Sequence, residues 1–357
     1  MKRTGETNAT YLGDVFRTID CMSKRHGQFV NVHLNPEFAA ASYGGLVTCG
    51  SVWACPLCAA KVQERRRCEI EAAMNWNENT GGTALMVTLT FPHMQFDTLA
   101  DLLTKQAQAF VYFRRTKAYA RLVKSTGFRG LIRSLEVTHG MNGWHPHTHE
   151  LWFVLPGVDQ AKLRDDLMEL WRASCVRSGL LDASSDHTAF ERHSVDVRSQ
   201  VGSADYLAKQ DDSRSWGLAA ELAKSSSKAG RAKGVHPHHF LVRKARGDDA
   251  HYLEYVRAMK GKRQLFWSHG LKGIAGINDI SDEELAEQTE EGSYLLALIP
   301  AGAWRFVLGN DARCEVLDAA ESGGLPAITA LLRVFGVPEH DLPLSPADCF
   351  SAERSGD

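Results

Sequence analysis

The stretch from residue 144 to residue 155 reads Trp144-His145-Pro146-His147-Thr148-His149-Glu150-Leu151-Trp152-Phe153-Val154-Leu155. The apolar run that follows the histidines predicts a buried β-strand. Side chains alternate between the two faces of a strand, so His147 and His149 share one face and can hold one metal ion. His145 precedes Pro146, which interrupts the pattern, and we therefore expect it to flank the site.

A second predicted strand, residues 131–138, lies just before this stretch and is joined to it by a turn rich in Gly and Asn at residues 139–143. Two strands joined in this way form an antiparallel hairpin. The hairpin places Glu136 beside His147 and His149, and such a group leaves open positions for substrate oxygens. It suits Mg²⁺ or Mn²⁺ as well as softer ions. The alternative is a surface Glu136 paired with Arg133 or a lysine.

Outward from this hairpin, the pattern of apolar residues predicts both strands and helices. The further predicted strands are residues 29–34, 83–91 and 194–197. Four helices are predicted, and the first is residues 59–76. The second is a long helix that is capped by Asp97 or Thr98 and runs to Lys124. The last two are residues 160–179 and residues 201–226, with a break near 211–215. Strands and helices are thus mixed along the chain.

Four cysteines near the N-terminus predict a second metal site. Cys55 and Cys58 have the Cys-x-x-Cys spacing of a zinc knuckle, and Cys49 lies six residues before them. Cys21 is the expected fourth ligand, with His33 and Cys68 as competitors. A structural Zn²⁺ is favoured over a redox or core Cys-x-x-Cys motif, because clustered cysteines in a reducing compartment favour a metal over a disulfide.

A third cluster of histidines occupies residues 235–240, Val-His-Pro-His-His-Phe. The sequence offers no acidic residue on a neighbouring strand to pair with it. We therefore expect His236, His238 and His239 to form no metal site.

Charge is unevenly distributed along the 357 residues, whose formal net charge is −2. Residues 276–357 hold 16 acidic and 4 basic side chains, a balance of −12, which leaves a balance of +10 for residues 1–275. The basic part favours a polyanion as partner. No apolar run reaches the length of roughly 20 residues that spans a bilayer, and no signal peptide is recognised, so a cytoplasmic location without membrane contact is expected.

Tyr206 and Lys209 lie three residues apart, on one face of the predicted helix that follows the metal-binding strand. A phenol is a poor nucleophile at neutral pH, because its pKa is about 10. A divalent ion on a phosphate oxygen makes the phosphorus electrophilic enough for such a nucleophile. Attack of Tyr206 on a DNA phosphodiester would give a 5′-phosphotyrosine and a free 3′-OH, with Lys209 steadying the developing charge.

The order of three motifs resembles the HUH endonucleases: Thr88-Leu89-Thr90, then His147-Thr148-His149, then Tyr206-x-x-Lys209. The cysteine segment 49–58, Trp144–His147 and the stretch containing Trp216, Glu221 and Lys228 are more closely similar to rolling-circle plasmid replication initiators of the Rep_1 type. The resemblance covers residues 20–245.

This resemblance implies an α+β fold with a central five-stranded antiparallel sheet, flanking helices, and the two histidines on a central strand. It also implies an enzyme that nicks a plasmid double-strand origin through Tyr206, primes synthesis from the 3′-OH and rejoins strands at termination. Origin DNA and the host helicase and polymerase are the implied partners. The expected domains are a zinc-binding module at 1–80, the HUH nicking and joining domain at 81–245, and an accessory region with an acidic tail at 246–357.

The sequence departs from some relatives at one position. They carry a glutamate one helical turn before the tyrosine, which activates water at termination, and here that position is Gly202. The candidate substitutes are Asp205, Asp211, Asp212 and Glu221.

Three other classes of protein share some of these features. A relaxase or a single-strand transposase would use the same metal and tyrosine, although relaxases usually place the tyrosine before the histidines. A metal-dependent oxygenase would use Glu136 and the histidines but leaves Tyr206 and the cysteines unexplained. A non-enzymatic zinc-binding DNA adaptor would bind DNA without forming a covalent product.

Overall fold

The computed structural model describes residues 17–199, 234–243, 245–288 and 292–347. The chain forms two compact units, one of residues 52–280 and one that combines residues 1–51 with residues 281–357. This grouping differs from the expected division at residues 80 and 245. Strand β1 (Phe29–Asn35) pairs antiparallel with strand β8 (Tyr294–Pro300), so the two ends of the chain belong to one unit.

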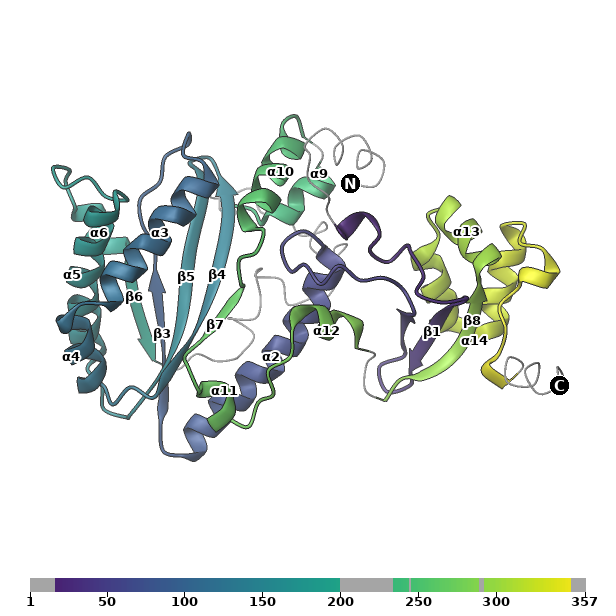
Figure 1. Ribbon diagram of the computed structural model, residues 1–357, viewed down its shortest axis with the longest axis horizontal. Helices are drawn as coiled ribbons and strands as arrows, with labels where there is room; N and C mark the ends of the chain where they lie inside the picture. The colour runs from purple at the N-terminus through teal and green to yellow at the C-terminus, as the bar shows by residue number, and fades with distance from the viewer. Residues whose placement is uncertain (1–16, 200–233, 244, 289–291, 348–357) are drawn as a thin grey trace. The chain divides into compact units, whose positions relative to one another are not determined.

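The larger unit is built on a five-stranded antiparallel sheet with the strand order β6-β3-β5-β4-β7 (Figure 1). Its strands are β3 (Thr83–Leu89), β4 (Gly130–Gly140), β5 (Gly143–Val154), β6 (Val195–Ser199) and β7 (Leu265–Trp267). The histidine-bearing strand β5 is the middle strand of the five. The predicted α+β class, with a central antiparallel sheet and flanking helices, is confirmed.

The hairpin of β4 and β5 begins earlier than the sequence suggested, because β5 starts at Gly143 and runs through Pro146. Pro146 lies opposite Val137 in the register, so it interrupts neither the strand nor the alternation of faces. Gly143 has a φ of +81°, and a Cβ there would lie only 3.0 Å from the carbonyl oxygen of Gln95. The expectation that Pro146 breaks the pattern is therefore wrong, and His145 shares a strand face with His147 and His149. His145 still lies outside the group of side chains that could hold an ion, as a flanking residue would.

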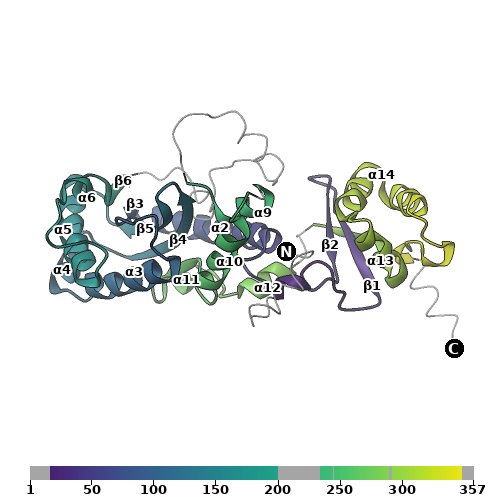
Figure 2. The same cartoon turned by 90° about the horizontal axis from the view of Figure 1, so that it is seen from above.

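Helices cover both faces of this sheet. On the face that carries His147, helix α2 (Pro56–Asn79) packs Ile70 against Leu151 and Phe153. On the opposite face, Arg114 of helix α3 (Leu99–Arg114) pairs with the buried Glu150. Figure 2 shows α2 and α3 on opposite sides of the sheet. Helix α2 contacts this face around Leu151 and Phe153, and the side chains of His147 and Glu136 are 13% and 21% exposed.

The long helix predicted to end at Lys124 is instead two helices, α3 and α4 (Lys117–Ser125). The chain breaks at Thr116, whose hydroxyl accepts a hydrogen bond from the backbone N–H of Tyr119 and so caps α4. The predicted cap at Thr98 is confirmed, since its hydroxyl accepts from the N–H of Asp101. Helix α5 (Gln160–Ser178) also forms as predicted.

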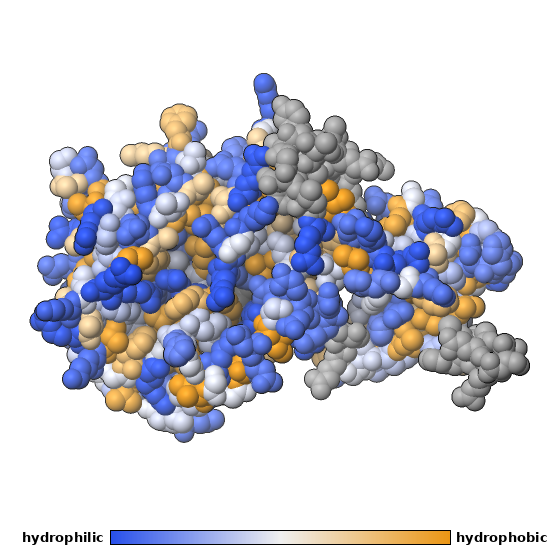
Figure 3. Space-filling view, in the orientation of Figure 1, coloured by the Kyte–Doolittle hydropathy of each residue, from blue (hydrophilic) through white to orange (hydrophobic). Residues whose placement is uncertain are grey.

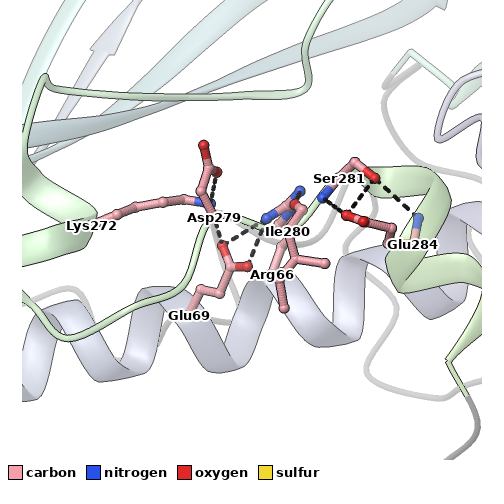
Figure 4. Close-up of polar contacts among 7 residues, drawn as sticks. All are labelled: Arg66, Glu69, Lys272, Asp279, Ile280, Ser281 and Glu284. Atoms are coloured by element: carbon pink, nitrogen blue, oxygen red, sulfur yellow. Dashed lines mark hydrogen bonds and ion pairs between the residues drawn. The ribbon is translucent and has the colours of Figure 1, made fainter.

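The other short elements of this unit surround the sheet. They are α6 (Thr188–His193), η2 (Pro237–His239), α9 (Phe240–Arg243), α10 (Asp248–Met259) and α11 (Leu271–Ile274). The segment after α11 is bonded to α2 by charged side chains, of which Arg66, Glu69 and Lys272 are half-buried and Asp279 is exposed (Figure 4). Lys272 contacts the carboxylates of Glu69 and Asp279, and the Arg66 guanidinium donates to the carbonyl of Ile280 at 2.8 Å. These charge-assisted bonds hold α2 beside the sheet edge.

The smaller unit contains a three-stranded antiparallel sheet, with β1 between β2 (Ala40–Gly44) and β8. Its helices and turns are η1 (Arg17–Ile19), α12 (Asp282–Glu287), α13 (Ala301–Gly309), α14 (Arg313–Val334) and η3 (Glu339–Asp341). Trp304 is buried in its core and donates its indole N–H to the carbonyl of Ser23. Ser281 and Glu284 form a capping box at the start of α12 (Figure 4).

The face of the molecule seen in Figure 3 is mostly hydrophilic, with hydrophobic side chains in smaller groups between. Within the described ranges, every helix is too short or too polar to cross a bilayer.

Candidate metal centre

The hairpin register brings together the three residues predicted to hold a divalent ion. Glu136 lies directly opposite His147 across the β4–β5 ladder, and Ser134 lies opposite His149. One carboxylate oxygen, Glu136 Oε2, lies 3.1 Å from His147 Nε2 and 3.2 Å from His149 Nε2. One ligand atom from each residue falls within 4.8 Å of the others, which is close enough for a single ion. The three side chains thus form the Glu136-His147-His149 group.

Neighbouring groups orient both imidazoles with Nε2 toward the carboxylate. His149 Nδ1 lies 2.9 Å from the hydroxyl oxygen of Thr88 on β3, and His147 Nδ1 lies 3.4 Å from the carbonyl oxygen of His145. With Nδ1–H donating to these oxygens, each Nε2 is directed at the position of the ion. Hydrogen bonds of this kind fix the tautomer and the ring orientation of metal-binding histidines.

The electrostatics of the group favour a cation. Burial raises the pKa of Glu136, but hydrogen bonds from His147 and His149 outweigh it and lower this pKa to about 2. The carboxylate is therefore ionised at neutral pH. A metal ion bound here would be held by Nε2 of both histidines and by a carboxylate oxygen of Glu136. The group offers two nitrogens and one oxygen and is partly exposed, which fits a divalent ion with open coordination positions.

Two further histidines lie beside this group: His145, which the sequence placed at its flank, and His93, which no sequence pattern indicated. His145 stacks near His147, with ring centroids 4.9 Å apart, and His93 lies 4.7 Å from His145. Burial and the neighbouring imidazoles of His147 and His93 lower the pKa of His145 to about 4, so this ring is neutral at neutral pH. The two-residue spacing of His145 and His147 was the available signal, whereas nothing local in the sequence indicates the contact of His93.

The structure also gives Thr88-Leu89-Thr90 a physical role. Thr88 lies opposite His149 in the β3–β5 register and contacts its ring, while Leu89 is buried on the other face. The carbonyl of Thr90 accepts the indole N–H of Trp171 on α5. This motif therefore orients one metal-binding histidine and anchors a core tryptophan.

The four predicted zinc ligands also come together. The sulfur atoms of Cys21, Cys49, Cys55 and Cys58 lie within 4.8 Å of one another, and all four residues are buried. Cys58 lies in the first turn of α2, because the helix begins at Pro56 and not at residue 59 as predicted. Four sulfurs at this separation match a closed tetrahedral site.

The alternative ligands lie elsewhere. Cys68 is exposed on α2, as its expected position on that helix implied, and His33 lies on β1. Of the third histidine cluster, His238 Nε2 contacts the carbonyl oxygen of Trp53 at 2.9 Å, and His236 Nδ1 accepts from the backbone of His238. Among the described residues, neither histidine belongs to a group of metal-binding side chains.

The expected nucleophile and its partner, Tyr206 and Lys209, lie outside the described residues. The same holds for Gly202 and for the candidate termination acids Asp205, Asp211, Asp212 and Glu221.

Comparison with known proteins gives a family and two relatives. The family described as "Replication protein" matches residues 47–297. "Protein rep" from Streptomyces lividans is 29% identical over 350 residues, which cover 78% of this chain and 76% of that protein. "Neomycin resistance protein" from Streptomyces cyanogenus is 35% identical over 136 residues, or 31% of each chain. No solved structure matches significantly.

Proposed function

The chain belongs to the replication-protein family, and we propose that it initiates rolling-circle replication of a plasmid by nicking one strand of the double-strand origin. It would then be a metal-dependent, site-specific DNA endonuclease and strand transferase. Origin DNA, single-stranded or extruded as a hairpin, would be its substrate, and the host helicase and polymerase would act on the nicked product.

The observation that carries this proposal is the Glu136-His147-His149 group on the middle of an antiparallel sheet. A rigid strand pair holds the three ligand atoms, and Thr88 orients one of them. Within the described residues the side chains of Glu136 and His147 are partly exposed, which would give a DNA strand access to them. Mg²⁺ or Mn²⁺ held there would polarise a non-bridging oxygen of the scissile phosphate.

Tyr206 is the proposed nucleophile. Its phenolic oxygen forms a bond to phosphorus, and the bond from phosphorus to the 3′ oxygen breaks. The phenolic proton is lost, and the departing 3′ oxygen takes up a proton to become the 3′-OH that primes synthesis. Lys209 would hold the phosphate and balance its developing negative charge.

Covalent attachment preserves the energy of the phosphodiester bond. A 3′-OH can therefore attack the 5′-phosphotyrosine in the reverse reaction and release Tyr206, which rejoins strands without ATP. A plain phosphodiesterase would need no tyrosine and would leave no covalent product.

The cysteine group would hold one structural Zn²⁺. A closed site of four thiolates has no open coordination position, so it contributes to folding and not to catalysis. The proposed ligands are Cys21, Cys49, Cys55 and Cys58.

A nicking assay tests this function. Supercoiled plasmid carrying the origin that the chain serves is incubated with the protein and Mn²⁺, and the proposal predicts conversion to nicked circles. A chelator and His147→Ala should each prevent nicking. Origin binding by the wild type without any nicking would contradict the proposal and support a non-enzymatic DNA adaptor.

A further inference from the structure

Three large apolar side chains are exposed together at the histidine end of the larger unit. Met94 is 70% exposed and Phe96 is 91% exposed, both in the loop after β3, and Met141 is 77% exposed at the tip of the β4–β5 hairpin. Figure 3 shows hydrophobic side chains projecting from the top of the view, where this end of the sheet lies. We name these three residues the apolar rim. Exposed apolar groups of this kind mark binding sites more often than chance.

Hydrogen bonds and a close backbone contact hold the two segments that carry the apolar rim. His93 Nδ1 lies 2.9 Å from the carbonyl oxygen of Asn142, so the loop is bonded to the hairpin tip. Asp97 closes a turn by accepting the N–H of Met94 at 2.7 Å and donating its own N–H to the carbonyl of that residue. The close approach of Gly143 to Gln95 joins the same two segments. The apolar rim is thus displayed by a fixed loop.

A line of imidazoles connects the apolar rim to the metal-binding group. His93, which follows Pro92 at the start of the loop, contacts His145, and His145 contacts His147. Met141 adjoins Asn142, whose carbonyl meets His93. These contacts place the apolar rim and the Glu136-His147-His149 group at the same end of the β4–β5 strand pair.

We propose that Met94, Phe96 and Met141 form a stacking surface for unpaired bases of single-stranded DNA next to the scissile phosphate. This inference rests on the proposed nicking function, because it takes the phosphate position from it. Single-stranded DNA carries both chemistries along one chain: flat π faces for Phe96 and the methionine sulfurs, and phosphates for the metal-binding group. Base pairs in a duplex hide those faces.

A protein partner fits this surface poorly. Stable protein interfaces bury at least about 1,000 Å² in total, far more than three side chains on one loop and one turn supply. Stacking on aromatic side chains is also tolerant of sequence, so this surface would hold the strand while other contacts select the site.

Binding to two synthetic strands tests the inference without knowledge of the origin. Fluorescence anisotropy compares oligothymidylate with an abasic phosphodiester strand of equal length, in the absence of divalent metal. The wild type should prefer oligothymidylate. Phe96→Ala combined with Met141→Ala should weaken oligothymidylate binding about tenfold and leave abasic binding unchanged. Phe96→Trp should keep the preference, because its indole also stacks.

Ile274→Ala is the matched control. Ile274 is an exposed apolar residue on α11, which packs near Gly130 at the opposite end of β4, and its loss should change neither affinity. The stacking surface is refuted if the Phe96/Met141 variant, with an unchanged melting temperature, keeps the full preference for oligothymidylate. If the wild type fails to nick origin DNA in the assay above, the proposed function itself fails. Normal nicking together with an unchanged base preference overturns the stacking surface alone.

Discussion

Glu136 and His147 face each other across the β4–β5 hairpin, and a carboxylate oxygen of the first lies 3.1 Å from Nε2 of the second. The two strands that carry these residues are joined by a loop of only Met141 and Asn142. A hairpin with a two-residue loop has a fixed register, so the separation of these ligands is set by local structure. The metal-binding group therefore depends on few long-range contacts.

The first prediction concerns this group. His147→Ala and His149→Ala should each abolish nicking, and Glu136→Ala should weaken Mn²⁺ binding, because each removes one of three ligands. Isothermal titration with Mn²⁺ and the plasmid nicking assay measure the two effects.

His238→Ala and His239→Ala are the controls, and both should affect nicking far less. His238 contacts the Trp53 backbone and lies outside any metal-binding group among the described residues. If these two prove essential while His147 and His149 are dispensable, the metal site has been assigned to the wrong cluster.

The second prediction concerns the orientation of His149. Thr88→Val keeps the shape of the side chain but removes the hydroxyl oxygen that holds Nδ1 at 2.9 Å. Loss of such a partner should lower metal affinity about 10- to 100-fold while the fold persists. Thr148→Val is a matched control, since Thr148 faces away from the metal and its buried hydroxyl has no partner among the described residues. Equal Mn²⁺ affinities for the two variants would argue against the role of Thr88.

The third prediction concerns zinc. Metal analysis of purified protein should find about one Zn²⁺ per chain that resists mild chelation. Cys55→Ser should lose this zinc and lower the melting temperature, whereas Cys68→Ser, at an exposed position on α2, should change neither. A Cys55→Ser protein with full zinc content and unchanged stability would refute the site. So would a Cys55–Cys58 disulfide in protein purified without oxidant.

Sequence periodicity was sufficient for the metal-binding group, because its members lie on two adjacent strands. Alternation along a strand placed His147 and His149 together, and the short turn placed Glu136 beside them. The same pattern did not show that the strand already includes His145, because a proline ordinarily interrupts a strand. Pro146 in fact occupies a ladder position opposite Val137, and the strand continues through it.

Contacts between segments far apart in the sequence could not be predicted from sequence patterns. Nothing in the strand at residues 29–35 indicates that it pairs with residues 294–300, so the predicted domain boundaries differ from the observed units. The break between α3 and α4 was also not predicted, because no glycine or proline marks the end of α3. The break lies at Thr116, whose side chain caps α4. The contact of His93 with Asn142 likewise depends on a folded loop.

The fourth prediction concerns stability and pH. Asp248, buried at the start of α10, accepts hydrogen bonds from Arg243 and from the N–H of Ala245, and the bonds from Arg243 lower its pKa. A carboxyl with a lowered folded-state pKa stabilises the fold above its unfolded pKa, and this is lost as the pH falls through the folded value. Asp248→Asn should therefore cost about 2 kcal/mol at pH 7.

Urea unfolding of the wild type and of Asp248→Asn at several pH values measures this effect. The difference between the two proteins should be full at neutral pH and should shrink as the pH falls below about 4, the unfolded pKa of an aspartate. A difference that is constant over this range would show that the charge of Asp248 contributes nothing.

The identity of the covalent link tests the central claim most directly. Wild-type protein is incubated with Mn²⁺ and single-stranded origin DNA, and an SDS-resistant adduct is digested and its modified peptide sequenced by mass spectrometry. We expect a nucleotide 5′-phosphate on Tyr206, and no adduct with Tyr206→Phe, which should still bind the strand. Full nicking by Tyr206→Phe, or an adduct on another residue, would contradict it.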